Sequence, residues 1–119
     1  MCIRDRAHHF RRFAPEDVPY AIRRYTDEVN RLYGVMNQTL ATRSWLAGSY
    51  SIADMACFPW LAHADWQGQT LEEFPFLQRW YEALAARPPV IAAMAAYPTR
   101  ELPAGEYGIL LNQRARDFL

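Results

Sequence analysis

The chain has 119 residues, and its 13 basic and 13 acidic side chains give no net charge at neutral pH. A chain of this length folds as one domain, and a hydrophobic share of 51% is enough for a packed core. The balanced charge gives no reason to expect a nucleic-acid partner, and no apolar run approaches the ~20 residues of a membrane-spanning helix. We therefore expect a globular domain with no nucleic-acid partner and no membrane partner.

The first six residues read Met-Cys-Ile-Arg-Asp-Arg, which is the peptide that one reading frame of a widely used sequencing-library adapter encodes. We expect residues 1–6 to be an artefact outside the fold, with the natural protein continuing upstream of Ala7. The two cysteines, Cys2 and Cys57, do not make a disulfide framework, so the expected compartment is a reducing cytoplasm. The apolar neighbours of Cys57 favour an inert core thiol over a reactive one.

Helical periodicity dominates the first 40 residues. Residues 7–14 are typical of the end of a helix, and a long amphipathic helix is predicted from about Pro19 to Leu40. Its apolar stripe recurs at steps of three and four residues and consists of Val18, Ile22, Tyr25, Val29, Leu32, Tyr33, Met36 and Leu40. The helix is therefore expected to bury one face and to expose the other.

The stretch that follows contains a helix start signal. Ser51 is a predicted N-cap, and Asp54 stands three residues on, so the two form a capping box with Asp in place of the commoner Glu. From Ile52 to Leu61 the residues are apolar on every side except at Asp54, which predicts a central helix buried all round. We expect this helix to reach about residue 64, with a bend at Pro59, and Gly48 before it to adopt a left-handed turn.

The remaining pattern is also helical. Pro75 opens a predicted helix that ends near Arg87, and residues 90–96 form a shorter helix expected to pack through Val90, Ile91 and Met94. No convincing strand alternation is present, so the predicted fold class is all-α. The helical domain is expected to span residues 7–97, followed by a loop and possible short helix over residues 98–119.

Residue chemistry alone points to no catalytic or metal site. His8 and His9 are adjacent and do not face one another on a helix, and no third ligand stands at metal spacing, so no metal is expected. No glycine-rich phosphate loop is present. The simplest interpretation of Arg23 and Arg24 is a solvated helix face with i,i+4 ion pairs to Asp27 and Glu28.

Two segments carry a family resemblance. Residues 45–61 read Trp-Leu-Ala-Gly-Ser-Tyr-Ser-Ile-Ala-Asp-Met-Ala-Cys-Phe-Pro-Trp-Leu, which resembles the helical-domain motif of cytosolic glutathione S-transferases. In that family the Ser/Thr-x-x-Asp cap opens the central helix and acts in folding. Residues 87–90, Arg-Pro-Pro-Val, resemble the family's later R-P-x-V segment. The resemblance covers roughly residues 7–97 and implies a C-terminal-like helical bundle whose thioredoxin-like domain is missing.

A narrower resemblance lies near the start, in His8-His9-Phe10, then Ala14-Pro15, then Pro-Tyr-Ala-Ile-Arg-Arg-Tyr over residues 19–25. These residues are similar to the bacterial Nu-class enzymes, of the disulfide-bond oxidoreductase type, and to their fungal relatives. The family pattern Pro-Tyr-Ala-Ile-x-Arg-Tyr places its glutathione-binding arginine at Arg24. Both Arg23 and Arg24 flank the apolar stripe, so periodicity does not choose between them and the assignment rests on resemblance alone.

The resemblance also implies what this chain lacks and what it supplies. In the family the thioredoxin-like domain provides most glutathione contacts and the residue that handles the sulfur, so no catalytic residue is expected here and the chain alone should be inactive. The helical domain shapes the second-substrate pocket, for which His9, Phe10 and Tyr20 are the candidates, and it contributes to a homodimer interface. Glutathione is the implied cosubstrate of the intact enzyme, whose chemistry is either glutathione transfer or disulfide reduction.

A different class of function fits the same resemblance. Similar helical domains occur in translation factors and synthetase assemblies as protein-interaction modules without catalysis. The Pro-Tyr-Ala-Ile-Arg-Arg-Tyr segment favours the enzyme. The sequence upstream of Ala7 would separate the two hypotheses, because only the enzyme needs a thioredoxin-like domain there.

Overall fold

A computed structural model describes residues 3–96 and contains helices with no strand in that range. The α-helices are α1 (Ile3–Arg12), α2 (Pro19–Leu40), α3 (Ile52–Leu61), α4 (Pro75–Ala85) and α5 (Pro88–Ala96), and a short 3-10 helix, η1, spans Asp65–Gln67. The all-α prediction is confirmed. The possible helix predicted beyond residue 98 lies outside the described residues.

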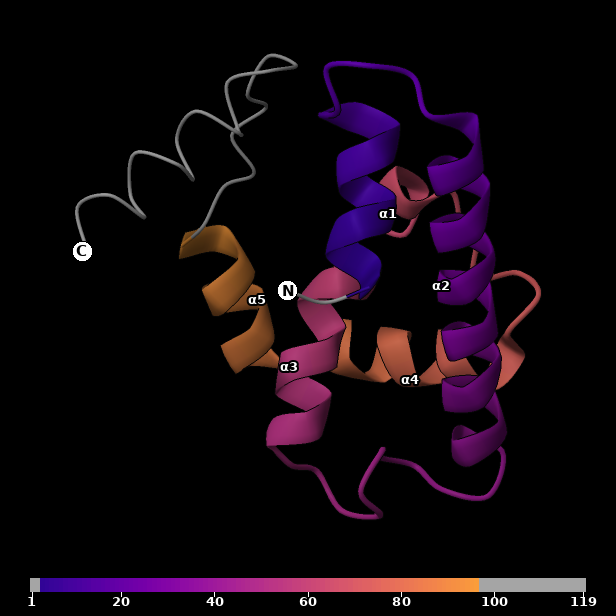
Figure 1. Cartoon of the computed structure of the whole chain (residues 1–119). Coiled ribbons are helices and arrows are strands. Elements are labelled where there is room, and N and C mark those ends of the chain that lie inside the picture. Colours follow the sequence, from indigo (N-terminus) through magenta and orange to yellow (C-terminus); the bar gives the residue numbers. More distant parts are fainter. Residues whose placement is uncertain (1–2, 97–119) are drawn as a thin grey trace, which may run out of the picture.

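The helices form two crossing layers. Figure 1 shows α1 and α2 side by side and antiparallel, with α4 crossing behind the lower half of α2 and α5 at the end of α4 away from α2. The core between them is built from the buried stripe of α2, including Val29, Tyr33 and Leu40, and from Leu77 and Trp80 of α4. Each of these side chains is almost fully buried, so the central part of the fold is held by burial of apolar area.

The predicted bounds of α2 agree with the structure, whereas three other helices differ at their ends. Helix α3 ends at Leu61, short of the predicted residue 64. Helix α1 begins at Ile3, inside the six residues that we expected to lie outside the fold. Helix α5 begins at Pro88, two residues before the predicted start. A proline is tolerated there because the N–H that it lacks has no partner within the helix at the first helical position. The two prolines therefore start α5, and the break from α4 falls at residues 86–87.

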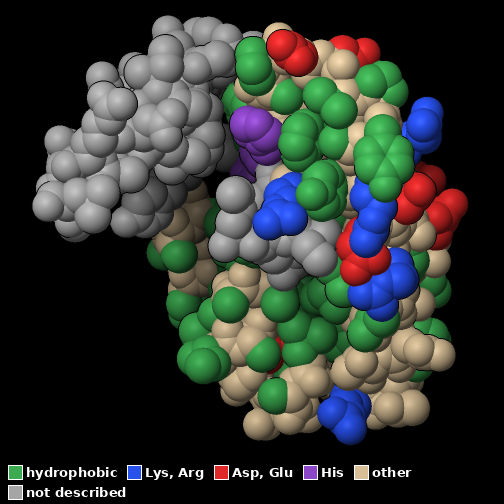
Figure 2. Space-filling model, in the orientation of Figure 1, with side chains coloured by type: hydrophobic (Ala, Val, Ile, Leu, Met, Phe, Trp, Pro, Cys, Tyr) green, Lys and Arg blue, Asp and Glu red, His purple; other side chains and the backbone are tan. Residues whose placement is uncertain are grey.

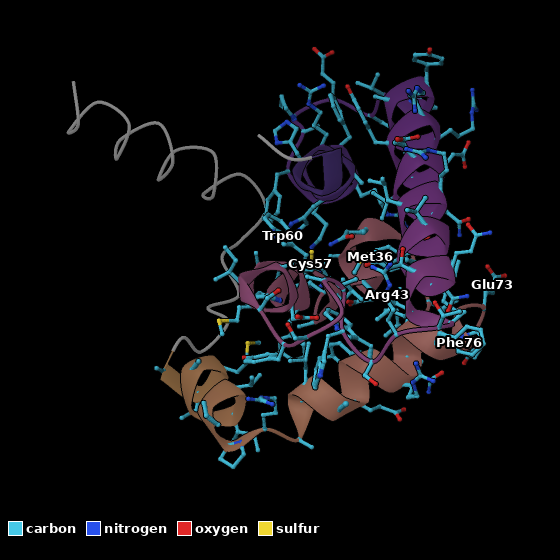
Figure 3. All side chains as sticks on the ribbon, turned by 90° about the horizontal axis from the view of Figure 1, so that it is seen from below. Met36, Arg43, Cys57, Trp60, Glu73 and Phe76 are labelled. Atoms are coloured by element: carbon cyan, nitrogen blue, oxygen red, sulfur yellow. The ribbon has the colours of Figure 1, made fainter. Side chains whose placement is uncertain are left out.

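The prediction that the helix after Ser51 is buried all round is wrong for the chain as described. Asp54, Phe58 and Leu61 are buried, but Ile52 is 81% exposed and Met55 is 51% exposed. Only one side of α3 meets other described elements, because α4 covers that side and nothing in residues 3–96 covers the other. Cys57 is half-buried and packs against the core cluster; Figure 3 labels it on α3.

The predicted packing of α5 is also largely wrong. Val90 is partly buried against the core, but Ile91 is exposed and Met94 is at the exposed limit. Within residues 3–96, no residue of α5 is buried, so its apolar side chains are left largely uncovered by the described elements. Its start is anchored by Arg87, whose guanidinium carbon lies 3.9 Å from the ring centroid of Tyr50. That cation–π contact joins the two segments that carried the family resemblance.

Asp54 joins three parts of the fold. The capping box is complete, with the Ser51 N–H donating to Asp54 Oδ2 at 2.9 Å, and the Ala53 N–H also donates to Ser51 Oγ at 3.3 Å. Asp54 Oδ1 also accepts from the Leu46 N–H at 3.0 Å and from Trp80 Nε1 at 2.7 Å. The fully buried carboxylate thereby ties the preceding loop to α3 and α4, which satisfies its need for partners.

Helices α2 and α4 cap each other. Asn37 of α2 accepts hydrogen bonds from the backbone N–H groups of Phe76 (2.9 Å) and Leu77 (3.0 Å), in the first turn of α4. In return, Arg79 of α4 donates to the carbonyl oxygen of Leu40 at 2.7 Å, at the last residue of α2. Figure 3 labels Phe76 at this junction, beside the lower end of α2. Each helix therefore satisfies end groups that its own flanking side chains leave open.

Two glycines adopt the left-handed conformation. Gly48, before α3, has a φ of +91°, which confirms the predicted turn. Gly68 ends η1 with a φ of +70°, and a Cβ there would lie 2.6 Å from the Arg11 guanidinium carbon. Arg11 thus crosses directly over the backbone of residue 68, which brings the end of α1 against η1.

Candidate functional site

Arg24 projects from the second turn of α2 with 57% of its side chain exposed. Its charged neighbour is Glu28, one turn further along, with Nη1 of Arg24 3.8 Å from Oε2 of Glu28. That separation is an ion pair but is too long for a hydrogen bond. The guanidinium therefore presents its donors to solvent, where an external carboxylate can reach them.

Glu28 is held much more tightly by Arg31 than by Arg24. Arg31 donates from Nε to Oε2 at 2.9 Å and from Nη2 to Oε1 at 2.7 Å, a two-point fork. This hydrogen-bonded arginine lowers the pKa of the Glu28 carboxyl below its ordinary value of 4.5. The Glu28 side chain is only 16% exposed, so its carboxylate is fixed in place between two arginines.

The two adjacent arginines of α2 differ in their surroundings. The predicted Arg24–Glu28 ion pair is present, but among the described residues no ion pair within 4.0 Å joins Arg23 to Asp27. Figure 2 shows charged side chains of both signs gathered over α2, along the right-hand edge of the view. Arg24 thus belongs to a fixed charge cluster with Glu28, whereas Arg23 does not.

The candidates for the substrate pocket fall into two groups. His9 packs edge-on against Phe10 at a centroid distance of 5.2 Å, and Phe10 stacks on Tyr25 at 5.5 Å. These ring contacts bring the end of α1 against α2 at Tyr25, the residue that follows Arg24. Tyr20 shares a face of α2 with Arg24, four residues apart, and is 72% exposed. No ring contact within residues 3–96 joins Tyr20 to His9 or Phe10.

Two residues near Arg24 were not predicted as part of this site. The sequence analysis placed Tyr25 in the apolar stripe and in the motif of residues 19–25 but gave it no role in the site, yet its ring stacks on Phe10 and holds it against α2. Arg31 stands three residues after Glu28, and this spacing on a helix was the sequence feature that could have predicted their ion pair. That signal was ambiguous because Arg24 stands at an equally suitable spacing on the other side of Glu28.

A second ring cluster lies where α1 meets η1. Trp66 stacks against His63 at a centroid distance of 4.4 Å and meets His8 in a tilted contact at 4.7 Å, and the Arg12 guanidinium carbon lies 4.2 Å from its ring centroid. Within the part of the chain that the structure describes, no group of three His, Cys, Asp or Glu side chains is placed to hold a metal ion. None of its helices combines the length and the apolar character needed to cross a bilayer.

Comparison with known proteins places this geometry in a family. The family model described as the glutathione S-transferase C-terminal domain matches residues 21–88. The disulfide-bond oxidoreductase YfcG of Escherichia coli is 45% identical over 82 residues, which cover 68% of this chain and 38% of YfcG. The match to YfcG agrees with the narrower resemblance to enzymes of the disulfide-bond oxidoreductase type.

Solved structures show the same arrangement of helices. Ure2p in complex with glutathione superposes with a TM-score of 0.72 at 36% identity and covers 78% of this chain and 45% of that one. The nitrogen regulation fragment of the yeast prion protein Ure2p gives a TM-score of 0.73 at 36% identity, with 80% and 47% covered. The chain therefore spans less than half the length of these relatives.

Proposed function

Because the chain belongs to the glutathione S-transferase C-terminal domain family, we propose that it is the helical domain of a glutathione-dependent enzyme. In the intact protein an upstream thioredoxin-like domain would hold the glutathione thiol, which attacks an electrophile or a disulfide. The helical domain would supply one glutathione contact, the pocket for the second substrate and part of a homodimer interface. A reducing cytoplasm is the compartment in which we expect the enzyme to work.

The observation that carries this proposal is the exposed guanidinium of Arg24 on α2. Glutathione has two carboxylates, and an arginine fork binds a carboxylate at two points. Arg24 has its donors turned to solvent and only a 3.8 Å contact to Glu28. The relatives described with bound glutathione support this choice of ligand.

Disulfide reduction is the finer form of the proposal. YfcG, which is named a disulfide-bond oxidoreductase, shares 45% of its residues with this chain over the matched segment. His9 and Phe10, packed against Tyr25, and the exposed Tyr20 would line the second-substrate pocket next to Arg24. The exposed apolar side of α3 would be covered by a part of the longer protein outside residues 3–96.

A chimera tests the enzyme hypothesis. This chain would replace the matching segment of YfcG, and glutathione-dependent reduction of a small disulfide would be measured after circular dichroism has verified folding. We expect activity, a raised KM for glutathione in the Arg24→Gln variant, and an unchanged KM in the matched Arg23→Gln variant. Equal KM values in the two variants would contradict a role for Arg24 in binding glutathione.

The interaction-module hypothesis is favoured by one comparison, since a relative is described as a nitrogen regulation fragment rather than as an enzyme. A chimera that folds with an unchanged melting temperature but reduces no disulfide would support that alternative. Activity that depends on Arg24 would exclude it.

A further inference from the structure

The availability of Arg24 for an external anion depends on what Glu28 binds. A guanidinium that is already paired with a carboxylate on its own helix must break that pair before it binds another. Glu28 stands four residues after Arg24 on the same face of α2, which is a favourable spacing for such a pair. Some other interaction must therefore keep the two from pairing fully.

Arg31 provides that interaction. Its Nε donates to Oε2 of Glu28 at 2.9 Å, and its Nη2 donates to Oε1 at 2.7 Å, so both carboxylate oxygens are engaged. The oxygen nearest Arg24 is Oε2, which already accepts the Arg31 Nε–H. Arg24 consequently stays at 3.8 Å from Glu28, outside hydrogen-bond distance.

The charges of the three side chains lead to the same conclusion. Arg24, Glu28 and Arg31 together carry one net positive charge, whereas Arg24 and Glu28 without Arg31 would carry none. We propose that Arg31 is a positioning residue for the anion site: by holding both oxygens of Glu28, it leaves the Arg24 guanidinium free for a carboxylate of glutathione. This inference rests on the proposed function of Arg24.

The test is a titration with glutathione of the chimera in which this chain replaces the matching segment of YfcG, followed by the NMR signals of the arginine Nε–H groups at low ionic strength, where charge effects are least screened. Arg31→Gln should weaken glutathione binding by about two- to fivefold, the range expected of an exposed ion pair. The matched control is Arg23→Gln, which removes the same charge from the same helix without touching Glu28. We expect it to leave the dissociation constant nearly unchanged.

A double variant separates positioning from a merely structural role. If Arg31 acts by occupying Glu28, adding Glu28→Gln to Arg31→Gln removes the competitor and should restore wild-type affinity. A structural defect caused by the loss of Arg31 would not be corrected by removing its partner. Asp27→Asn is the matched control, since it changes the helix charge equally and should not restore binding.

The outcomes for Arg24 and Arg31 are distinguishable. If Arg24→Gln binds glutathione as tightly as the wild type, the proposed function of Arg24 fails, and the role of Arg31 fails with it. If Arg24→Gln weakens binding but Arg31→Gln does not, or if Glu28→Gln fails to restore it, only the positioning role is overturned. Arg31 is 60% exposed, so its replacement by glutamine should leave the fold intact, which circular dichroism would verify.

Discussion

Helices α2 and α3 differ in how fully other described elements cover their apolar residues. The apolar stripe of α2 is met by α1 and α4, and its predicted bounds agree with the structure. The apolar residues of α3 lie on all its sides, but only the side with Asp54, Phe58 and Leu61 is covered. Figure 2 shows the contrast on one face, with charged side chains over α2 and hydrophobic ones over α3 at the lower left. Hydrophobicity therefore specifies that a surface is to be covered but does not say which element covers it.

The largest expected effect comes from breaking the buried side of α3. Asp54→Ala leaves Trp80 Nε1 and the N–H groups of Leu46 and Ser51 without their acceptor in a buried site. Unsatisfied buried donors cost about 1–3 kcal/mol each, so we expect a loss of about 3 kcal/mol or more. Thermal unfolding should show a melting temperature lower by on the order of 15 °C.

One result would count against that account of Asp54. An unchanged melting temperature and refolding rate in the Asp54→Ala variant would contradict its structural role. Ser51→Ala provides a graded comparison, because it removes the cap hydroxyl but leaves the Asp54 carboxylate in place, and it should cost about 1 kcal/mol.

The next effect concerns the junction of α2 with α4. Asn37→Ala removes the acceptor for two N–H groups in the first turn of α4, and it should cost about 1–2 kcal/mol, as loss of a helix cap does. The neighbouring exposed residue gives the control, since Gln38→Ala removes no such bond. Equal urea-unfolding midpoints for the two variants would show that α4 does not depend on this cap.

The charged face of α2 should respond to pH. Because Arg31 lowers the pKa of Glu28, the pair stabilises the fold above the ordinary carboxyl pKa of 4.5, and this contribution is lost as pH falls through the lower, folded-state value. The melting-temperature difference between wild type and Glu28→Gln should therefore be small and positive near neutral pH and should vanish in acid. A difference that grows on acidification has the wrong sign for this ion pair.

The smallest effect is expected on the exposed side of α3. Ile52→Ser should change the free energy of unfolding by less than about 0.5 kcal/mol, because the side chain is 81% exposed. Phe58→Ala, on the buried side of the same helix, should cost about 3–5 kcal/mol. A large loss of unfolding free energy in Ile52→Ser would mean that another part of this chain covers the outer side of α3.

The sequence was sufficient where local signals decide the structure. Proline at the first helical position marks the starts of α2 and α4, and Ser51 with Asp54 marks the start of α3. It was insufficient where the outcome depends on neighbours from elsewhere in the chain. The reciprocal caps made by Asn37 and Arg79 join residues about 40 positions apart, and no local pattern reveals them.

The candidate site shows the same limit. Helical spacing allowed Glu28 to pair with either Arg24 or Arg31, and only the distances of 3.8 Å and 2.7 Å identify Arg31 as the closer partner. The pocket candidates His9 and Phe10 are joined to α2 by Tyr25, a contact between separate helices. The assignment of Arg24 over Arg23 came from family resemblance, and the environments of the two arginines now give a physical difference to test.

The most direct test of the central claim is a glutathione titration of the chimera that carries the wild-type chain in place of the matching segment of YfcG, followed by its arginine Nε–H signals. We predict that the signal lost in Arg24→Gln shifts on addition of glutathione, and that glutathione diethyl ester, in which both carboxylates are replaced by uncharged esters, causes no such shift. A shift confined to the signal of Arg23, or an equal response to the ester, would contradict the account.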